Sequence, residues 1–145
     1  MPSVQDVLLA KGDHIHSISP GATVLEAIRK MNHHKIGALV VMEDAQVVGM
    51  FTERDILRRV AGEERPVAQV LVGEVMTTKV ICCKPDADLD EVSALMKDHR
   101  VRHVPVCDDL GRLHGLISIG DVNAVHASHQ EQTINFLNDY IYGRA

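Results

Sequence analysis

The chain has almost no aromatic side chains. It contains no tryptophan, two phenylalanines and two tyrosines among its 145 residues. Proteins that read single-stranded RNA or DNA stack the bases on aromatic side chains, so the composition argues against this class. The hydrophobic core must be filled by Val, Ile, Leu, Ala and Met instead.

An excess of positive charge and a long apolar run are also lacking. The formal net charge is -5, with 15 Lys and Arg against 20 Asp and Glu, whereas duplex binding needs an extended positive surface. No apolar run reaches the roughly 18 residues of a membrane span, and the first residues have no basic, apolar signal pattern. We therefore expect a cytoplasmic protein with no nucleic-acid and no membrane partner.

Cysteine is scarce, and no metal or catalytic constellation is recognisable. Cys82, Cys83 and Cys107 form no C-x-x-C pair, so we interpret them as small buried hydrophobic residues, with a redox thiol as the alternative. His14-x-His16 and His33-His34 each place two imidazoles close together, but no third metal ligand follows at a recognisable spacing. Ser118 with His103 or His99 could form a nucleophile and its base, but nothing places a third, orienting group, so we expect neither an enzyme nor a required cofactor.

The chain repeats itself. Sliding the sequence by 65 residues, and by 66 beyond a one-residue insertion near Leu110, aligns its two halves, which predicts two copies of one structural unit. The identical pairs are Pro20/Pro85, Ala22/Ala87, Glu26/Glu91, Met31/Met96, His34/His99, Val41/Val106, Asp44/Asp109, Gly49/Gly115 and Asp55/Asp121.

Each copy has the pattern strand, helix, strand, strand, helix. In the first copy a Thr23-x-x-Glu26 capping box precedes an amphipathic helix, and a turn separates two apolar strands. The expected first-copy elements are strand 14–18, a helix from 23, strand 36–42, strand 47–51 and helix 52–61. The expected second-copy elements are strand 80–83, helix 88–99, strand 101–107, strand 113–117 and a helix from 118.

Short helices are expected outside the repeated unit. Ser3–Lys11 and Val67–Val75 read as helical segments leading into each copy, and Gln130–Ile141 reads as an amphipathic tail helix. The predicted fold is α/β (α+β), with two β-α-β-β-α repeats packed through their small sheets and related by a pseudo-two-fold axis. We expect residues 1–65 and 66–129 to form the two repeats with their lead-in helices, and 130–145 to form the tail helix.

A T/S-x-x-D turn follows the last strand of each copy. These turns are Thr52-x-x-Asp55 and Ser118-x-x-Asp121. Alone, either reads as an ordinary helix N-cap. A strand-to-helix turn with free N–H groups can also bind phosphate, and its carboxylate can accept two hydrogen bonds from a ribose diol. Because the copies face each other, two equivalent clefts are expected.

Two further features each have a structural and a ligand-binding interpretation. Pro105 interrupts the strand 101–107, which either marks an edge strand or leaves a carbonyl free to read a nucleobase. The first copy has Val40 there, so the clefts should differ. His99-Arg100 and His34-Lys35 end a helix in each copy, where they offset the helix dipole or neutralise a phosphate, with Arg54 assisting in the first cleft.

These motifs resemble a tandem pair of cystathionine-β-synthase (CBS) domains, a Bateman module. The resemblance rests on Val75-Met76-Thr77, on the segment 85–91, on His99–Val106 and on both G-x-x-[T/S]-x-x-D motifs. It implies a non-catalytic sensor that binds an adenine nucleotide between the copies, AMP first, with ATP, ADP, NAD(H) or S-adenosylmethionine as alternatives. It also implies a homodimer and a regulated partner acting in trans. An interaction adaptor without ligand, or a small redox or metal-dependent enzyme, is the competing interpretation.

The resemblance assigns roles to individual residues. Asp55 and Asp121 would hold ribose hydroxyls, and Thr52 and Ser118 would contact ribose or phosphate. The remaining nucleotide-binding candidates are His16, Lys35, Ile36, Ala38, Leu39, Arg54, Val80, Ile81, His99, Arg100, Val101, His103, Val104, Pro105 and Gly120.

Overall fold

The first copy forms the three-stranded sheet and the helices that the pattern predicts. The computed structural model describes residues 2–12 and 14–142. The Thr23 hydroxyl accepts from the Glu26 N–H at 3.1 Å, and the Glu26 carboxylate accepts from the Thr23 N–H at 3.1 Å, which confirms the capping box. The elements are β1 (Ser17–Ile18), α2 (Val24–His34), β2 (Ala38–Glu43), β3 (Gln46–Thr52), α3 (Glu53–Asp55) and a π-helix, η1 (Ile56–Ala61).

The second copy repeats much of this arrangement, but its sheet has two strands, β4 and β5, instead of three. Both sheets shift register at the equivalent step, between Val41 and Met42 and between Val106 and Cys107. Helices α2 and α5 both end in a left-handed residue, Lys35 with φ 55° and Arg100 with φ 54°. The elements are α5 (Leu89–His99), β4 (His103–Cys107), β5 (Leu113–Ser118) and α6 (Ile119–Tyr142).

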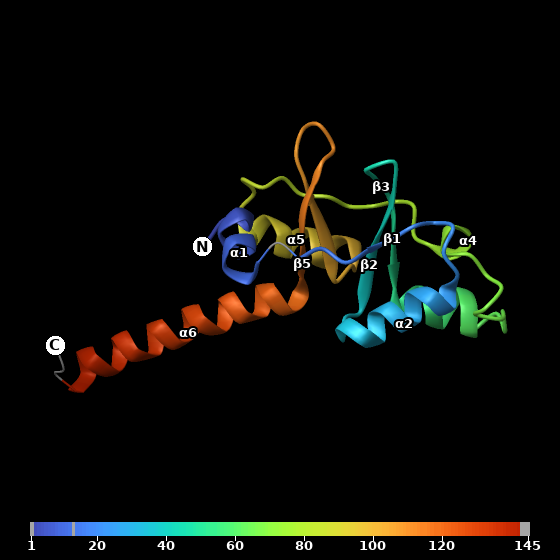
Figure 1. The fold of residues 1–145 in the computed structure, drawn as a ribbon. Helices are drawn as coiled ribbons and strands as arrows, with labels where there is room; N and C mark the ends of the chain where they lie inside the picture. The colour runs from blue at the N-terminus through green and yellow to red at the C-terminus, as the bar shows by residue number, and fades with distance from the viewer. Residues whose placement is uncertain (1, 13, 143–145) are drawn as a thin grey trace.

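The two sheets pack face to face, as expected. Ala38, Val40 and Met50 from the first sheet form a buried cluster against Leu113 and Leu116 of β5. In Figure 1, α5 and β5 lie beside β2, β3 and α2, while α6 extends away from both copies. Because two- and three-stranded sheets are marginal alone, this interface holds the copies together.

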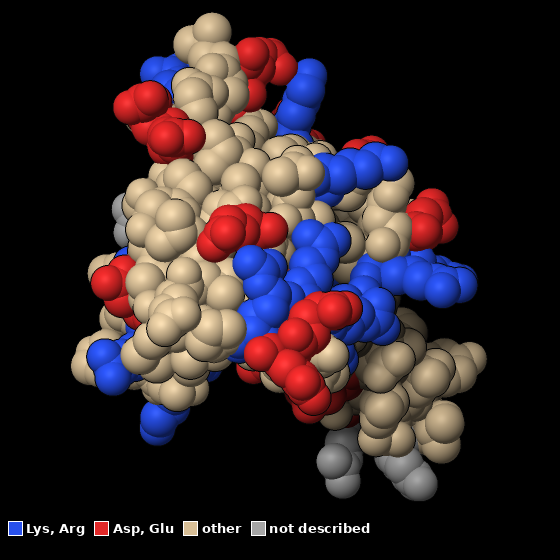
Figure 2. Space-filling model, turned by 90° about the vertical axis from the view of Figure 1, so that its right-hand side faces the viewer, with Lys and Arg blue, Asp and Glu red and all other residues tan. Residues whose placement is uncertain are grey.

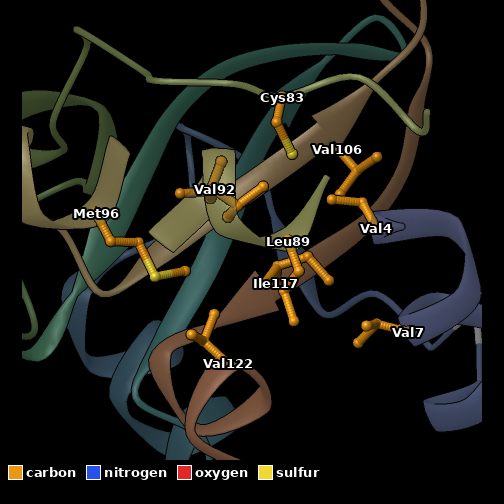
Figure 3. Packing of buried hydrophobic residues seen from close by; sticks show 10 residues of the cluster. Val4, Val7, Cys83, Leu89, Val92, Met96, Val106, Ile117 and Val122 are labelled. Atoms are coloured by element: carbon orange, nitrogen blue, oxygen red, sulfur yellow. The ribbon is translucent and has the colours of Figure 1, made fainter. Parts of the chain in front are cut away.

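Each lead-in segment packs on the opposite copy. Helix α1 (Val4–Lys11) places Val4 and Val7 in the hydrophobic core of the second copy, as Figure 3 shows beside Leu89 and Ile117. Its Val4 N–H donates to the Ala87 carbonyl at 2.9 Å. Conversely, α4 (Val72–Val75) packs in the core of the first copy. The lead-in segments are therefore exchanged between the copies.

The expected strand 80–83 is absent from the described fold. Only Cys83 pairs with β4, as an isolated parallel bridge to Val106. In the first copy the same pairing is longer, because the Val40 N–H donates to the His16 carbonyl at 3.2 Å. Pro105 occupies the position of Val40 and has no N–H, so the second-copy ladder stops. Cys82 is consequently exposed rather than buried, which corrects the expectation for this cysteine.

Other expected elements also differ in extent, among them the strands expected at 36–42 and 101–107, which are Ala38–Glu43 and His103–Cys107. The strand expected at 14–18 is paired only at Ser17–Ile18, and the lead-in 67–75 is helical only over Val72–Val75. Residues after Asp55 wind as a π-helix, with the Gly62 N–H donating to the Leu57 carbonyl at 2.8 Å. The tail helix is continuous with α6, because no proline or glycine interrupts the chain after its first turn. Residues 143–145 lie outside the described part.

Gly49 marks a close approach between β3 and the residues that follow α4. A Cβ at this position would lie 2.7 Å from Met76 Sδ and 2.9 Å from the Thr77 carbonyl oxygen. Thr77 also exchanges backbone hydrogen bonds with Met50 at 2.8 and 2.9 Å. The backbone oxygen cannot move without weakening this pairing, so only glycine fits.

We expect Gly49→Ala to lower the free energy of unfolding by about 1–3 kcal/mol, the usual cost of overpacking a core. Urea denaturation measures the change. Gly21→Ala is the control, since its Cβ would meet nothing closer than Ser19 Oγ at 3.7 Å. Equal stability of the two variants would show that Gly49 is not spatially required.

Candidate functional site

A cavity of about 390 Å³ lies between the two copies. One wall is the Thr52-x-x-Asp55 turn after β3, and the other is the unpaired segment at Val80 and Ile81 with the start of β4. We call it the inter-copy cavity. Its lining residues are Gly37, Met50, Thr52, Glu53, Arg54, Asp55, Thr77, Lys79, Val80, Ile81, His99, Arg100, Val101, Arg102, His103, Pro105 and Ile119.

The carboxylate of Asp55 is held in a fixed orientation at this cavity. The residue is only 4% exposed. Its Oδ2 accepts from the Thr52 N–H at 3.0 Å and from Thr52 Oγ1 at 3.3 Å, and its Oδ1 accepts from Thr77 Oγ1 at 3.0 Å. Arg59 Nε also lies 3.8 Å from Oδ1. An ionised carboxylate has about four lone-pair sites, so acceptor capacity remains for about one further hydrogen bond from a ligand.

The opposite wall presents backbone and apolar side chains. The ladder geometry of the first copy would pair the Ile81 carbonyl with an N–H at position 105, as His16 pairs with Val40. Pro105 cannot donate, so this carbonyl is left as an acceptor. Val80, Ile81 and Pro105 supply an apolar surface around it. The wall can therefore bind a flat, mostly apolar ring that carries a donor on one edge.

Cations line one end of the inter-copy cavity. Arg54 Nη1 donates to the Arg100 carbonyl at 3.0 Å, which joins α3 of the first copy to the C-terminus of α5. Lys79 and Arg102 also line the cavity. Although the net charge is -5, Figure 2 shows Lys and Arg side chains gathered near the middle of one face. This end of the cavity is suited to an anionic group.

His103 stands in this wall as a neutral side chain. Burial and the neighbouring Arg102 charge lower the pKa of His103 from its ordinary value of 6.5. Glu53 and Asp121 raise it less than burial lowers it. A neutral imidazole at pH 7 can both donate and accept hydrogen bonds.

The second T/S-x-x-D turn is occupied by the chain itself. Asp121 Oδ2 accepts from the Ser118 N–H at 2.8 Å, and it also accepts from Lys11 Nζ of α1 at 2.7 Å. Lys11 donates to the Leu116 carbonyl at 2.9 Å as well. Burial raises the pKa of Asp121, but the Lys11 and Ser118 hydrogen bonds outweigh it and lower the pKa overall. An ammonium group therefore stands where a second ligand would contact the carboxylate.

The structure separates the candidate residues into two groups. Ten of them line the inter-copy cavity: Thr52, Arg54, Asp55, Val80, Ile81, His99, Arg100, Val101, His103 and Pro105. The other nine lie outside it: His16, Lys35, Ile36, Ala38, Leu39, Val104, Ser118, Gly120 and Asp121.

Strand alternation and local contacts explain the second group. Leu39 and Val104 are fully buried in the helix-facing cores, and Ala38 is buried between the sheets. They cannot contact a ligand in the inter-copy cavity. His16 instead stacks on His34 with ring centroids 4.0 Å apart, and burial lowers its pKa.

Several lining residues were not among the sequence candidates. Glu53 and Arg102 each adjoin a candidate in the sequence, and Thr77 lies in the Val75-Met76-Thr77 motif. Their proximity to these motifs could have identified them as lining residues. Lys11, which contacts Asp121 outside the inter-copy cavity, had no such signal. Its contact with Asp121 spans 110 positions, which neither repeat nor spacing predicts.

Apart from His99 and His103, the cysteines and histidines lie outside the inter-copy cavity. Cys107 Sγ lies 3.8 Å from Cys82 Sγ, and burial with the neighbouring thiol raises the pKa of Cys107 to about 12. Burial raises the pKa of Cys83 to about 11, so this thiol stays protonated. Within residues 2–12 and 14–142, no three His, Cys, Asp or Glu side chains cluster as metal ligands would. No helix of the same residues is long and apolar enough to span a bilayer.

Comparisons with known proteins find one family in both halves of the chain. The CBS domain family matches residues 4–62 and 72–126. The mitochondrial CBS domain-containing protein CBSX3 of Arabidopsis thaliana is 36% identical, over 97% of this chain and 72% of its own length. The CBS-domain containing protein ATU1752 from Agrobacterium tumefaciens is 40% identical, with a TM-score of 0.81 over 86% of this chain and 99% of that one.

One structural neighbour contains adenosine-derived ligands. The CBS domain pair of protein MJ0100, in complex with 5'-methylthioadenosine and S-adenosyl-L-methionine, has a TM-score of 0.76 and 25% identity. The alignment covers 86% of this chain and 99% of that one. Because CBSX3 is a mitochondrial protein, the expectation of a cytoplasmic location stays a prediction.

Because the pKa of His103 is lowered in the folded protein, the free energy of unfolding should depend on pH. Its folded pKa lies below the ordinary 6.5 of the unfolded chain, so the unfolded state binds more protons between those values. Stability should fall as the pH drops below about 6.5. We expect His103→Gln to lose less stability than the wild type between pH 7 and pH 5 in urea denaturation. The matched control, His129→Gln on exposed α6, should behave as the wild type; an unchanged acid response in His103→Gln would refute the assignment.

Proposed function

The chain belongs to the CBS domain family as a tandem pair, and from this premise we propose that it is a non-catalytic sensor that binds one adenine nucleotide in the inter-copy cavity. The observation that carries the proposal is the joint presence of a fixed carboxylate, Asp55, and an unpaired backbone acceptor, Ile81, on opposite walls of one cavity. These groups complement a ribose diol and the amino group of adenine.

The adenine base would lie against Val80, Ile81 and Pro105. Its amino group can donate to the Ile81 carbonyl, and aliphatic side chains cover its faces. This mode of binding needs no aromatic platform, which agrees with the near absence of aromatic residues. The neighbour that binds 5'-methylthioadenosine and S-adenosyl-L-methionine supports an adenosine-derived ligand.

The ribose and phosphate would occupy the other wall and the cationic end. Asp55 would accept a hydrogen bond from a ribose hydroxyl, with Thr52 beside it. Arg54 and Arg100 would neutralise the α-phosphate, and AMP is the smallest nucleotide that uses all three contacts. The cavity touches both copies, so a bound ligand would shift their relative arrangement only by its preference for one arrangement.

The second cleft would not bind an equivalent ligand. Lys11 Nζ contacts Asp121, and the Val40 N–H already pairs with the His16 carbonyl. The Asp121 carboxylate and the His16 carbonyl, which would recognise a ligand in this cleft, thus both accept hydrogen bonds from within the chain. We therefore propose one site per chain, rather than the two that the repeat alone suggests.

The signal would pass to a partner in trans or through a homodimer. Beyond the body, α6 exposes Ile134, Phe136, Tyr140 and Ile141. An exposed apolar helix face is the kind of surface that partners cover. This exposed face of α6 supports association of the chain with another protein, and a second molecule of the same chain is the simplest candidate.

The test is a thermal-shift panel with AMP, ATP, NAD(H) and S-adenosylmethionine, followed by calorimetric titration. A ligand at about 100 times its Kd stabilises by roughly 2.7 kcal/mol, or about 8 °C for a chain of this size. We expect a shift with adenine nucleotides and a stoichiometry of one per chain. The absence of any shift across the panel would overturn the proposal.

Asp55→Asn and Asp121→Asn form a matched pair of variants. Each replaces the carboxylate of a T/S-x-x-D turn by an isosteric amide. We expect Asp55→Asn to weaken nucleotide binding by about tenfold to a hundredfold, because one charged acceptor for the ribose is lost. Asp121→Asn should change the affinity by less than about twofold, since Lys11 holds that turn. Equal losses in the two variants would place ligand at both turns.

A further inference from the structure

Two cysteine side chains from distant parts of the chain lie in contact, and neither lines the inter-copy cavity. Cys107 ends β4, and its thiol donates a hydrogen bond to the Cys82 sulfur across an Sγ–Sγ distance of 3.8 Å. We call these two residues the thiol pair. The first copy has Ser17 and Met42 at the equivalent positions, so the thiol pair belongs to the second copy alone.

The alternation of the extended backbone separates the thiol pair from the third cysteine. Cys83 and Val106 form a parallel bridge, and both are buried in the hydrophobic core of the second copy, as Figure 3 shows. Neighbouring residues of an extended chain point to opposite faces, so Cys82 and Cys107 share the face away from this core. Cys82 is exposed and Cys107 is partly exposed, and a small oxidant can therefore reach the thiol pair but not Cys83.

The two sulfur atoms are close enough to bond after a small movement. A disulfide is about 2.05 Å long, so the sulfur atoms must approach by about 1.8 Å. Cys107 is held in place, because its N–H donates to the Cys83 carbonyl at 2.9 Å and it pairs with Leu113 of β5. Cys82 makes no backbone hydrogen bond to any described residue, since the ladder stops at Pro105. Cys82 is therefore the partner that can move.

We propose that the thiol pair is an oxidation site, which a hydroperoxide converts to a Cys82–Cys107 disulfide. The Cys82 thiolate attacks hydrogen peroxide, an S–O bond forms as the O–O bond breaks, and the released hydroxide takes up a proton as water. The Cys107 sulfur then attacks the Cys82 sulfenic acid, and the S–O bond breaks to release a second water that carries the Cys107 proton. The two thiols lose two electrons and two protons in total, and one peroxide is reduced to two waters.

The order of the two steps follows from the surroundings of the two sulfur atoms. Burial and the neighbouring thiol raise the pKa of Cys107 to about 12, so Cys107 keeps its proton at neutral pH. The thiolate is the form that attacks a peroxide, and the exposed Cys82 is the thiol that reacts first. A dithiol reductant reverses the bond by thiol–disulfide exchange.

The disulfide also affects the inter-copy cavity, and this consequence rests on the proposed function. Ile81, whose carbonyl would accept from the adenine amino group, immediately precedes Cys82. Formation of the bond draws Cys82 toward the end of β4 and displaces the neighbouring carbonyl. Hydrogen bonds weaken steeply when their geometry is lost. The reduced chain is therefore the form that binds nucleotide more tightly.

Mass spectrometry after peroxide treatment tests the oxidation site. The full chain is reduced, exposed to hydrogen peroxide, unfolded and alkylated with N-ethylmaleimide. We expect the loss of two hydrogen atoms, one alkylated cysteine, Cys83, and a cross-linked peptide that joins Cys82 to Cys107 and disappears with dithiothreitol. Three alkylated cysteines, a bond to Cys83 or a bond between two chains would overturn the proposal.

Matched variants keep the assignment testable. Cys83→Ala retains the thiol pair and should form the same cross-link, whereas Cys82→Ser should form none. Cys82 is exposed, so Cys82→Ser should fold as the wild type does. A cross-link of unchanged yield in Cys82→Ser would also refute the assignment.

Calorimetric titration with AMP tests the effect on the inter-copy cavity. We expect the oxidised wild type to bind AMP at least about threefold more weakly than the reduced wild type, and peroxide-treated Cys82→Ser to bind as the reduced wild type does. If the disulfide forms and the affinity is unchanged or higher, its control of the cavity is refuted while the nucleotide sensor stands. If the reduced chain binds no adenine nucleotide, the proposed function fails, and mass spectrometry alone decides whether the thiol pair is an oxidation site.

Discussion

Packing of the two small sheets against each other is the contact on which the rest of the structure depends. Neither sheet is large enough to be stable alone, and Ala38, Val40 and Met50 bury their side chains against β5 of the other copy. The exchange of lead-in helices adds a second connection, because each hydrophobic core contains residues of the other half. A cavity between the copies is therefore part of a single folded unit, and its walls are positioned by both.

Two departures from the internal symmetry make the two clefts different. Pro105 ends a backbone ladder that Val40 continues in the first copy, and this leaves the Ile81 carbonyl as an acceptor in one cleft. Lys11 engages Asp121 in the other cleft. Duplication supplies the scaffold, and in the function that we propose these local differences determine which cleft binds the ligand.

The repeat, the element order and the capping boxes could be predicted, because each depends on local patterns such as Thr23-x-x-Glu26. Residues that line the inter-copy cavity could be predicted from the T/S-x-x-D turn, from Pro105 and from the basic pair His99-Arg100. The exchange of lead-in helices and the Lys11 contact could not be predicted, because both join segments far apart in the chain. The missing strand at 80–83 was predictable in principle, since a strand cannot pair with the N–H that Pro105 lacks.

The central claim is that a backbone carbonyl in the open cleft reads the amino group of adenine. Calorimetric titration with AMP and IMP tests it most directly, because the two nucleotides share ribose and phosphate and differ only in the base. Hypoxanthine carries an oxygen in place of the adenine amino group, and this oxygen would face the Ile81 carbonyl without a hydrogen. We expect IMP to bind at least about tenfold more weakly than AMP. Equal affinities for AMP and IMP would contradict it.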